Sequence, residues 1–128
     1  MSDTKRYYKL VRDKIPKVIR ENGSSCKSRR ASTDAEFVLL LRAKLHEEVE
    51  EFLKDPCVEE AADILQVLID SCEYHKISWL RVEGAKNKKF LARGGFSHRI
   101  VLEEVSSSSS EDELVDIHAR VIDHQDGE

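Results

Sequence analysis

The fold is decided by the stretch Leu45-His46-Glu47-Glu48-Val49-Glu50-Glu51-Phe52 and by Glu59-Glu60-Ala61-Ala62-Asp63-Ile64-Leu65 after it. In both segments apolar residues recur three or four positions apart, which is the spacing of an amphipathic helix. Asp55-Pro56 lies between the two segments, and a residue before proline disfavours the helical backbone. The pattern therefore predicts helices over 33–54 and 57–74, packed as an antiparallel hairpin across a very short connection.

Each predicted helix carries one acidic residue inside its apolar stripe and a second acid at the edge of that stripe. With residues placed about 100° apart, Glu48 falls inside the apolar arc of the first helix and Glu51 on its edge. In the second helix Glu60 falls inside the arc and Asp63 on its edge. Because residues three positions apart share a helix face, both acids of each pair point the same way.

The hairpin turn brings the two acidic pairs together. Glu48 and Asp63 are equally far from the middle of the turn, and so are Glu51 and Glu60. Four carboxylates are therefore expected to converge at the edge of an apolar core, where like charges raise pKa values or require cations. Oxygen ligands suit Mg²⁺ or Mn²⁺, so the pattern favours metal binding, above all for Glu48 and Glu60. The remaining acids of the two motifs are expected to be solvated: Glu47, Glu50 and Glu59.

A carboxylate-bound Mg²⁺ suggests a phosphate substrate, since this ion keeps few protein ligands and bridges phosphate oxygens. Such a substrate also needs cationic side chains. One candidate group lies on a helix predicted over 78–92 and just beyond its end: Lys86, Lys89 and Arg93. The other lies near the N-terminus: Lys9, Arg12 and Lys14. No nucleic-acid partner is expected, because residues 1–105 are close to neutral and only 6% of the chain is aromatic.

Before the hairpin the chain is predicted to be mostly irregular. Residues 7–11 are interpreted as a short strand or an extended arm, and a helical turn is predicted from Pro16 to Asn22-Gly23. Residues 23–32 are small, polar and basic, which is typical of a loop. Thr33 followed by Glu36 fits a capping box at the start of the first long helix.

Gly94-Gly95 is expected to end the third predicted helix. Residues 99–105 are interpreted as a short strand. Five serines at 106–110 are typical of a flexible linker. The chain has a net charge of −4, yet residues 106–128 hold seven acids and one arginine. Residues 111–122 fit either a short amphipathic helix or a solvated acidic tail, and the tail is favoured. The sequence thus predicts a domain over 1–105 and a Ser-rich acidic tail over 106–128.

The composition also indicates where the protein resides. The longest apolar runs, Phe37–Leu41 and Ile64–Ile69, the latter interrupted by Gln66, are far shorter than the ~20 residues of a membrane span. No secretory signal is visible at the N-terminus, so neither a membrane nor secretion is expected. Three cysteines with irregular spacing fit neither a disulfide framework nor a zinc site, which favours reduced thiols in the cytoplasm.

Taken together, three ordered motifs resemble those of the MazG-like all-α nucleoside triphosphate pyrophosphohydrolases, a superfamily that includes phosphoribosyl-ATP pyrophosphohydrolase. The acidic motifs Glu47-Glu48-Val49-Glu50-Glu51 and Glu60-Ala61-Ala62-Asp63 resemble its E-E-x-x-E and E-x-x-D signature. The flanking motifs resemble a compact subgroup: Lys9-Leu10-Val11-Arg12-Asp13-Lys14-Ile15-Pro16 before them, and Arg93-Gly94-Gly95-Phe96 with Arg99-Ile100 after them. The resemblance covers residues 7–105.

This resemblance implies an all-α fold with a four-helix-bundle core, often completed between subunits. It implies Mg²⁺-dependent cleavage of a nucleoside triphosphate to a monophosphate and pyrophosphate, a reaction that would serve nucleotide-pool house-cleaning. By position, the metal ligands would be Glu48, Glu51, Glu60 and Asp63. Glu47 would orient the attacking water, which makes Glu47, Glu48 and Glu51 the candidate catalytic residues. The basic residues of the two groups above would face the phosphates.

Alternatives stay open at this point. One is phosphoribosyl-ATP as the substrate, and another is a nucleotide- or metal-binding regulator without catalysis, with the acidic tail docking a partner. A di-iron bundle is disfavoured because no Glu-x-x-His pair occurs in the motifs. Two helices and a short basic third one cover each other poorly, so a homodimer or higher homo-oligomer is expected.

Overall fold

The structure is a computed structural model that describes residues 3–107. Within that range the regular structure is entirely helical. The four helices are α1 (Ile15–Glu21), α2 (Asp34–Lys54), α3 (Val58–Tyr74) and α4 (Trp79–Arg93). None of these helices combines the length and the apolar character that a bilayer crossing requires. The all-α expectation is thus confirmed for the described residues. The predicted Ser-rich acidic tail, including the segment 111–122, lies outside them apart from residues 106 and 107.

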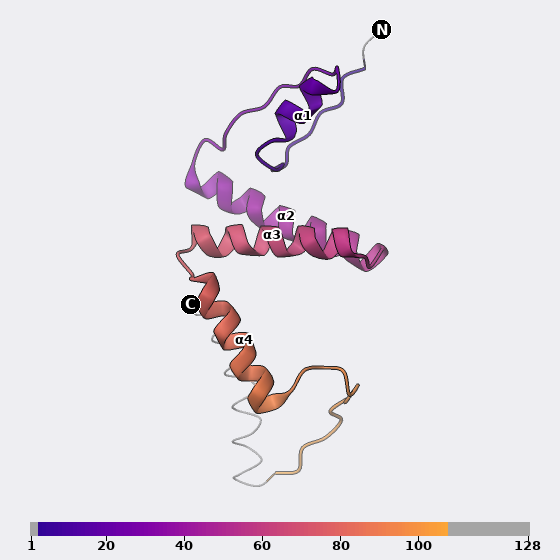
Figure 1. The fold of residues 1–128 in the computed structure, drawn as a ribbon, viewed down its shortest axis with the longest axis vertical. Helices are drawn as coiled ribbons and strands as arrows, with labels where there is room; N and C mark the ends of the chain where they lie inside the picture. Colours follow the sequence, from indigo (N-terminus) through magenta and orange to yellow (C-terminus); the bar gives the residue numbers. More distant parts are fainter. Residues whose placement is uncertain (1–2, 108–128) are drawn as a thin grey trace. The chain divides into compact units, whose positions relative to one another are not determined.

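The chain divides into two units, one up to residue 88 and one from residue 89, with the boundary inside α4. The first unit is built on α2 and α3, which pack along one another as the predicted antiparallel hairpin (Figure 1). Residues 55–57 connect them, and the Asp55 N–H still donates to the Glu51 carbonyl at 3.0 Å before Pro56 prevents continuation. The hairpin is what fixes the relative register of the two acidic motifs.

The helix ends follow from local chemistry. The Thr33 hydroxyl accepts a hydrogen bond from the Glu36 N–H at 3.1 Å, as the capping box predicts. The Glu36 carboxylate does not return to the Thr33 N–H but accepts from the Ser32 N–H at 2.7 Å. At α4 the Ser78 hydroxyl accepts from the Arg81 N–H, and Gly94 follows the helix with a φ of 80°, a conformation that glycine adopts without steric cost.

The two segments flanking the helices are irregular. Residues 7–11 form an extended arm rather than a strand, and the short strand expected at 99–105 is absent. The reason is that a strand is stabilised by pairing, and within residues 3–107 no second strand exists to pair with it. The second unit continues instead from the end of α4 into a tight turn, in which the Arg99 N–H donates to the Phe96 carbonyl at 3.2 Å.

The hydrophobic core lies between α2 and α3 and is small. Its buried apolar members, among the described residues, are Leu40, Leu41, Val67 and Cys72. The apolar face of α3 is wider than α2 can cover, so Leu65 and Leu68, placed inside the stripe by the sequence pattern, are 48% and 38% exposed. Val49 of α2 is likewise exposed, which shows that the buried seam is narrower than the apolar arcs predict.

Candidate metal centre

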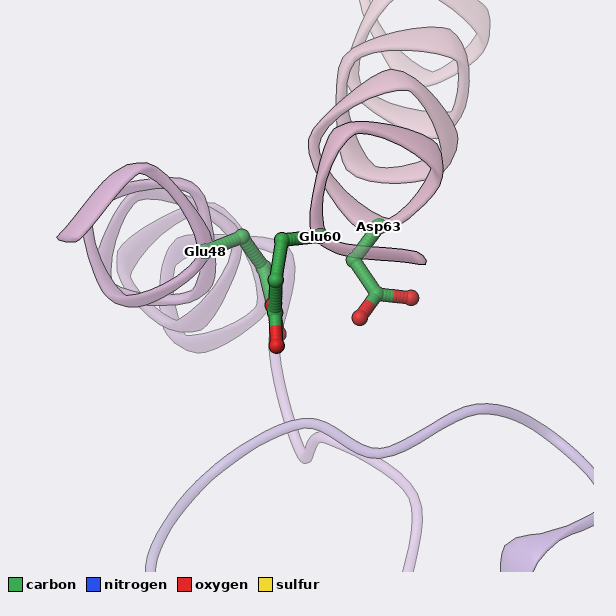
Figure 2. Close-up of side chains that lie close together, drawn as sticks. All are labelled: Glu48, Glu60 and Asp63. Carbon is green, nitrogen blue, oxygen red and sulfur yellow. The ribbon is translucent and has the colours of Figure 1, made fainter. Parts of the chain in front are cut away.

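Three acidic side chains from the two long helices meet at one point. Glu48 on α2 and Glu60 and Asp63 on α3 each offer a carboxylate oxygen, and these oxygens lie within 4.8 Å of one another. Figure 2 shows the Glu48 and Glu60 side chains reaching toward each other from facing helices, with Asp63 beside Glu60. We call these three residues the acid triad. Its spacing would let a single small cation contact all three carboxylates.

The triad follows directly from the hairpin. Glu60 and Asp63 are three residues apart on α3 and so share a face, and the antiparallel register brings Glu48 opposite them. Glu48 is only 8% exposed, a rare state for a carboxylate in a helix interior unless it has a partner. The predicted convergence of these three acids is therefore seen in the structure.

The triad concentrates negative charge. Partial burial raises the pKa of Glu60 above its ordinary value, and the neighbouring carboxylates of Asp63, Glu51, Glu48 and Asp55 raise it further. Within residues 3–107, no basic side chain lies within ion-pair distance of Glu60. Repulsion between neighbouring carboxylates is relieved either by a proton or by a bound cation. Glu60 is therefore the member of the triad that a proton or a cation would stabilise most.

The other two members of the triad have basic partners. The Lys44 ammonium lies 3.1 Å from a Glu48 oxygen and 3.6 Å from a Glu47 oxygen, one helical turn earlier on α2. The Arg12 guanidinium donates to Asp63 Oδ1 at 2.8 Å. Lys44 did not figure among the residues predicted from the sequence. Its spacing of three and four residues before two acids was the signal that could have found it.

Glu51 and Glu47 lie at the margin of the triad. Glu51 does not join the group of oxygens within 4.8 Å, although its charge contributes to the raised pKa of Glu60. Glu47 is half-buried, and its carboxylate is held between Lys44 and Lys9, whose ammonium donates to it at 3.3 Å. The expectation that Glu47 is a freely solvated acid is therefore replaced by a paired carboxylate at the edge of the site.

The predicted basic residues divide into two sets. Lys9 and Arg12 belong to the N-terminal arm (residues 3–14) and contact the acids, whereas the exposed Lys14 makes no side-chain hydrogen bond or ion pair among the described residues. The other set lies exposed on α4: Lys86, whose ammonium donates to Asn87, and Lys89 and Arg93. Phosphate contacts by any of these residues stay predictions.

Glu36, an acidic residue outside the triad, ties the arm to the start of α2. Its carboxylate accepts two hydrogen bonds from the Arg29 guanidinium, at 2.9 and 2.8 Å, and one from the Tyr8 hydroxyl at 2.8 Å. With the Ser32 N–H these donors stabilise the ionised form, and they hold the pKa of Glu36 well below its usual range. The same carboxylate raises the pKa of Tyr8, because the hydroxyl proton is held in the hydrogen bond.

Comparisons of this chain with protein-family models, with curated proteins and with solved structures found no match.

Proposed function

We propose that this chain is a Mg²⁺-dependent nucleoside triphosphate pyrophosphohydrolase of the MazG-like kind, which cleaves a nucleoside triphosphate to a monophosphate and pyrophosphate. The observation that supports it most is the acid triad: Glu48, Glu60 and Asp63 present oxygens within 4.8 Å of one another from two helices in fixed register. The sequence motifs that resemble this superfamily place their acids at the same three positions.

The donor set of the triad fits a hard divalent cation. Its members are carboxylates, with Glu48 buried and Glu60 crowded by negative charge, and this is the environment that Mg²⁺ or Mn²⁺ would neutralise. In the proposal Glu51 adds a fourth ligand from the next turn of α2. When bound, the ion supplies positive charge to the phosphate oxygens and lowers the pKa of a coordinated water.

The chain's own side chains then have distinct tasks. Lys9 and Arg12 already lie beside the acids, so in the proposal they turn from Glu47 and Asp63 to the phosphates when substrate arrives. Glu47, released from Lys9, orients the attacking water and accepts its proton. The water oxygen attacks the α-phosphorus, and the oxygen that bridges the α and β phosphates leaves with pyrophosphate. Lys14 and Lys86 are proposed as further phosphate contacts.

A homodimer or higher homo-oligomer belongs to the proposal, in which two hairpins complete a four-helix bundle. It is supported by the thin core, since among the described residues no side chain is less than 2% exposed. Leu65 and Leu68 leave an apolar strip along α3 that a second hairpin would cover. Light scattering should then give a dimer or larger species, and a Leu65→Gln, Leu68→Gln variant should be smaller. A monomeric wild-type chain would contradict this part.

Product analysis tests the proposed reaction. Purified chain is incubated with a panel of ribo- and deoxyribonucleoside triphosphates and Mg²⁺, and the products are separated by ion exchange. We expect monophosphate and pyrophosphate from wild type and none from a Glu48→Gln, Glu60→Gln variant. The matched control is Glu50→Gln, Glu59→Gln, which removes two exposed acids of the same motifs and should retain activity.

Other outcomes decide between the remaining functions. Diphosphate and inorganic phosphate would show that the bond between the β and γ phosphates is cleaved instead. Turnover of phosphoribosyl-ATP alone would assign the chain to that substrate. Metal and nucleotide binding without turnover of any substrate would favour the regulator.

A further inference from the structure

The basic loop (residues 23–32) has no place in the proposed reaction, yet it ends in a distinctive sequence. Arg29 and Arg30 stand three and two positions before Ser32, with Ala31 between. Ser32 is exposed and lies in irregular backbone immediately before α2. Serine kinases choose substrates partly by charge patterns around the acceptor, and an acidic kinase surface recognises arginines at these two positions.

The structure links Ser32 to the arm through Arg29 and Glu36. Arg29 Nη1 lies 3.3 Å from the Ser32 hydroxyl oxygen while the same guanidinium holds Glu36 with two hydrogen bonds. The Ser32 N–H also donates to Glu36, so the serine and the carboxylate are immediate neighbours. Tyr8 of the arm donates to that carboxylate as well. Any new charge on Ser32 would therefore be felt by one carboxylate and by the arm that it holds.

We propose that Ser32 is a phosphorylation site for a kinase that recognises basic sequences, and that the phosphate separates Arg29 from Glu36 and thereby releases the arm. In the transfer the Ser32 oxygen bonds to the γ-phosphorus of ATP held by the kinase. The bond between that phosphorus and the oxygen bridging to the β-phosphate breaks, ADP leaves, and the hydroxyl proton passes to the kinase's base.

The physical effect of the phosphate has two parts. It brings nearly two negative charges and three acceptor oxygens to a position beside Arg29, where it competes for the guanidinium. It also repels the Glu36 carboxylate, whose hydrogen bond to the Ser32 N–H keeps it close. Glu36 then loses its hydrogen bonds from Arg29, and its carboxylate moves out of the position in which it accepts the hydrogen bond from Tyr8. Because Lys9 and Arg12 follow on the same arm, this modification would regulate access to the acid triad from a distance.

The test uses the full chain, a purified serine kinase that prefers arginine at these positions, and ATP. Fragment mass spectrometry locates the phosphate, and ¹³C-tyrosine NMR follows the Tyr8 ring, with Tyr74 as internal control. We expect phosphate on Ser32 in wild type, none in Ser32→Ala, and wild-type incorporation in Ser28→Ala. The Tyr8 signal should move, on phosphorylation, to its position in a Glu36→Ala variant, in which the Tyr8 hydroxyl has lost its acceptor.

Three results would overturn the proposal. The first is phosphorylation of a peptide spanning residues 24–37 without phosphorylation of the folded chain, because the loop would then be shielded. The second is incorporation in Ser32→Ala equal to wild type, which would assign the phosphate to Thr33 or elsewhere. The third is a fully phosphorylated Ser32 with an unmoved Tyr8 signal. None of these readouts requires catalytic activity, so they stand whether or not the proposed hydrolysis is correct.

Discussion

Glu36 and Glu60 are two glutamates of one hairpin in opposite electrostatic situations. Glu36 accepts hydrogen bonds from Arg29, Tyr8 and the Ser32 N–H, and its pKa is lowered. Glu60 stands beside other carboxylates, has no basic partner among the described residues, and its pKa is raised. A carboxylate surrounded by donors holds structure together, whereas a carboxylate surrounded by carboxylates is available for a cation.

The comparison gives a way to separate structural from functional acids in an acid-rich chain. With 25 acidic residues, charge alone cannot single out a site. What distinguishes Glu60 of the acid triad is repulsion at a partly buried position that no basic partner among the described residues relieves, because a folded protein keeps such a cost only where something offsets it.

The largest expected effect is on metal affinity. Replacing Glu48 and Glu60 together by glutamine should weaken Mn²⁺ binding by about 100-fold or more, because two of the three converging oxygens lose their charge. Glu36→Gln should leave the affinity within a factor of about two, since within residues 3–107 the hydrogen bonds and ion pair of Glu36 reach no member of the triad. Calorimetric titration measures both, and an equal loss in Glu36→Gln would erase the proposed distinction.

The substitution Lys44→Met tests how the burial of Glu48 affects stability. It removes the ammonium that lies 3.1 Å from the buried Glu48, so the metal-free protein should lose about 1–3 kcal/mol of unfolding free energy. Mg²⁺ should recover much of this loss, because it would replace the missing positive charge. Denaturant unfolding with and without Mg²⁺ measures the difference. A loss that Mg²⁺ leaves unchanged would indicate that Lys44 contributes by packing alone.

The two glutamates should respond to pH in opposite directions in metal-free protein. Glu36 has a pKa below its ordinary 4.5, so its stabilisation is complete above pH 4.5 and is lost as the pH falls further. Glu60 has a pKa above 4.5, so its ionised form destabilises the fold at neutral pH and this cost disappears on acidification toward 4.5. At pH 7, Glu36→Gln should therefore lower the Tm and Glu60→Gln should raise it.

Thermal unfolding of the two variants from pH 7 to about pH 2 measures this contrast. As the pH falls, the difference in Tm between each variant and wild type should shrink. The difference for Glu60→Gln should shrink at a higher pH than the difference for Glu36→Gln. If Glu60→Gln lowered the Tm in the presence of a chelator, the crowding argument would be wrong.

The smallest expected effect comes from Tyr8→Phe, which removes one of the four hydrogen bonds to Glu36 and keeps the ring. The Tm should fall by no more than about two degrees, because Arg29 still neutralises the carboxylate. Trypsin should nevertheless cut after Lys9 faster than in wild type, as the arm loses one attachment. Unchanged cleavage would show that the ion pairs of Lys9 and Arg12 alone hold the arm.

The hairpin and the triad could be predicted because their information is local. Helical spacing, the Thr33 cap and the Asp55-Pro56 stop set the two helices, and equal distances from the turn paired Glu48 with Asp63. The same symmetry about the turn wrongly predicted that the Glu51 carboxylate would join the closest group of oxygens. Equal sequence distance fixes the height along a helix pair, but side-chain reach and rotation decide which oxygens meet, so Glu51 stays outside the closest group.

What could not be predicted depends on contacts between distant segments. The Tyr8 bond to Glu36 spans 28 residues and the Arg12 bond to Asp63 spans 51, and no periodicity encodes either. The width of the buried seam between α2 and α3 could not be predicted either. A helical wheel gives the apolar arc of one helix, but it does not give how much of that arc a neighbouring helix covers. Leu65 and Leu68 are exposed for that reason.

The three-residue connection between α2 and α3 has a kinetic consequence. All three triad acids lie between residues 48 and 63, so they come together as soon as the ends of α2 and α3 that adjoin the turn close, an event of low contact order and small loop entropy. We therefore expect their mutual repulsion to oppose an early step of folding. A divalent cation in the refolding buffer should accordingly speed the refolding rate itself, and the acids that mark the site would also set the pace at which the chain folds.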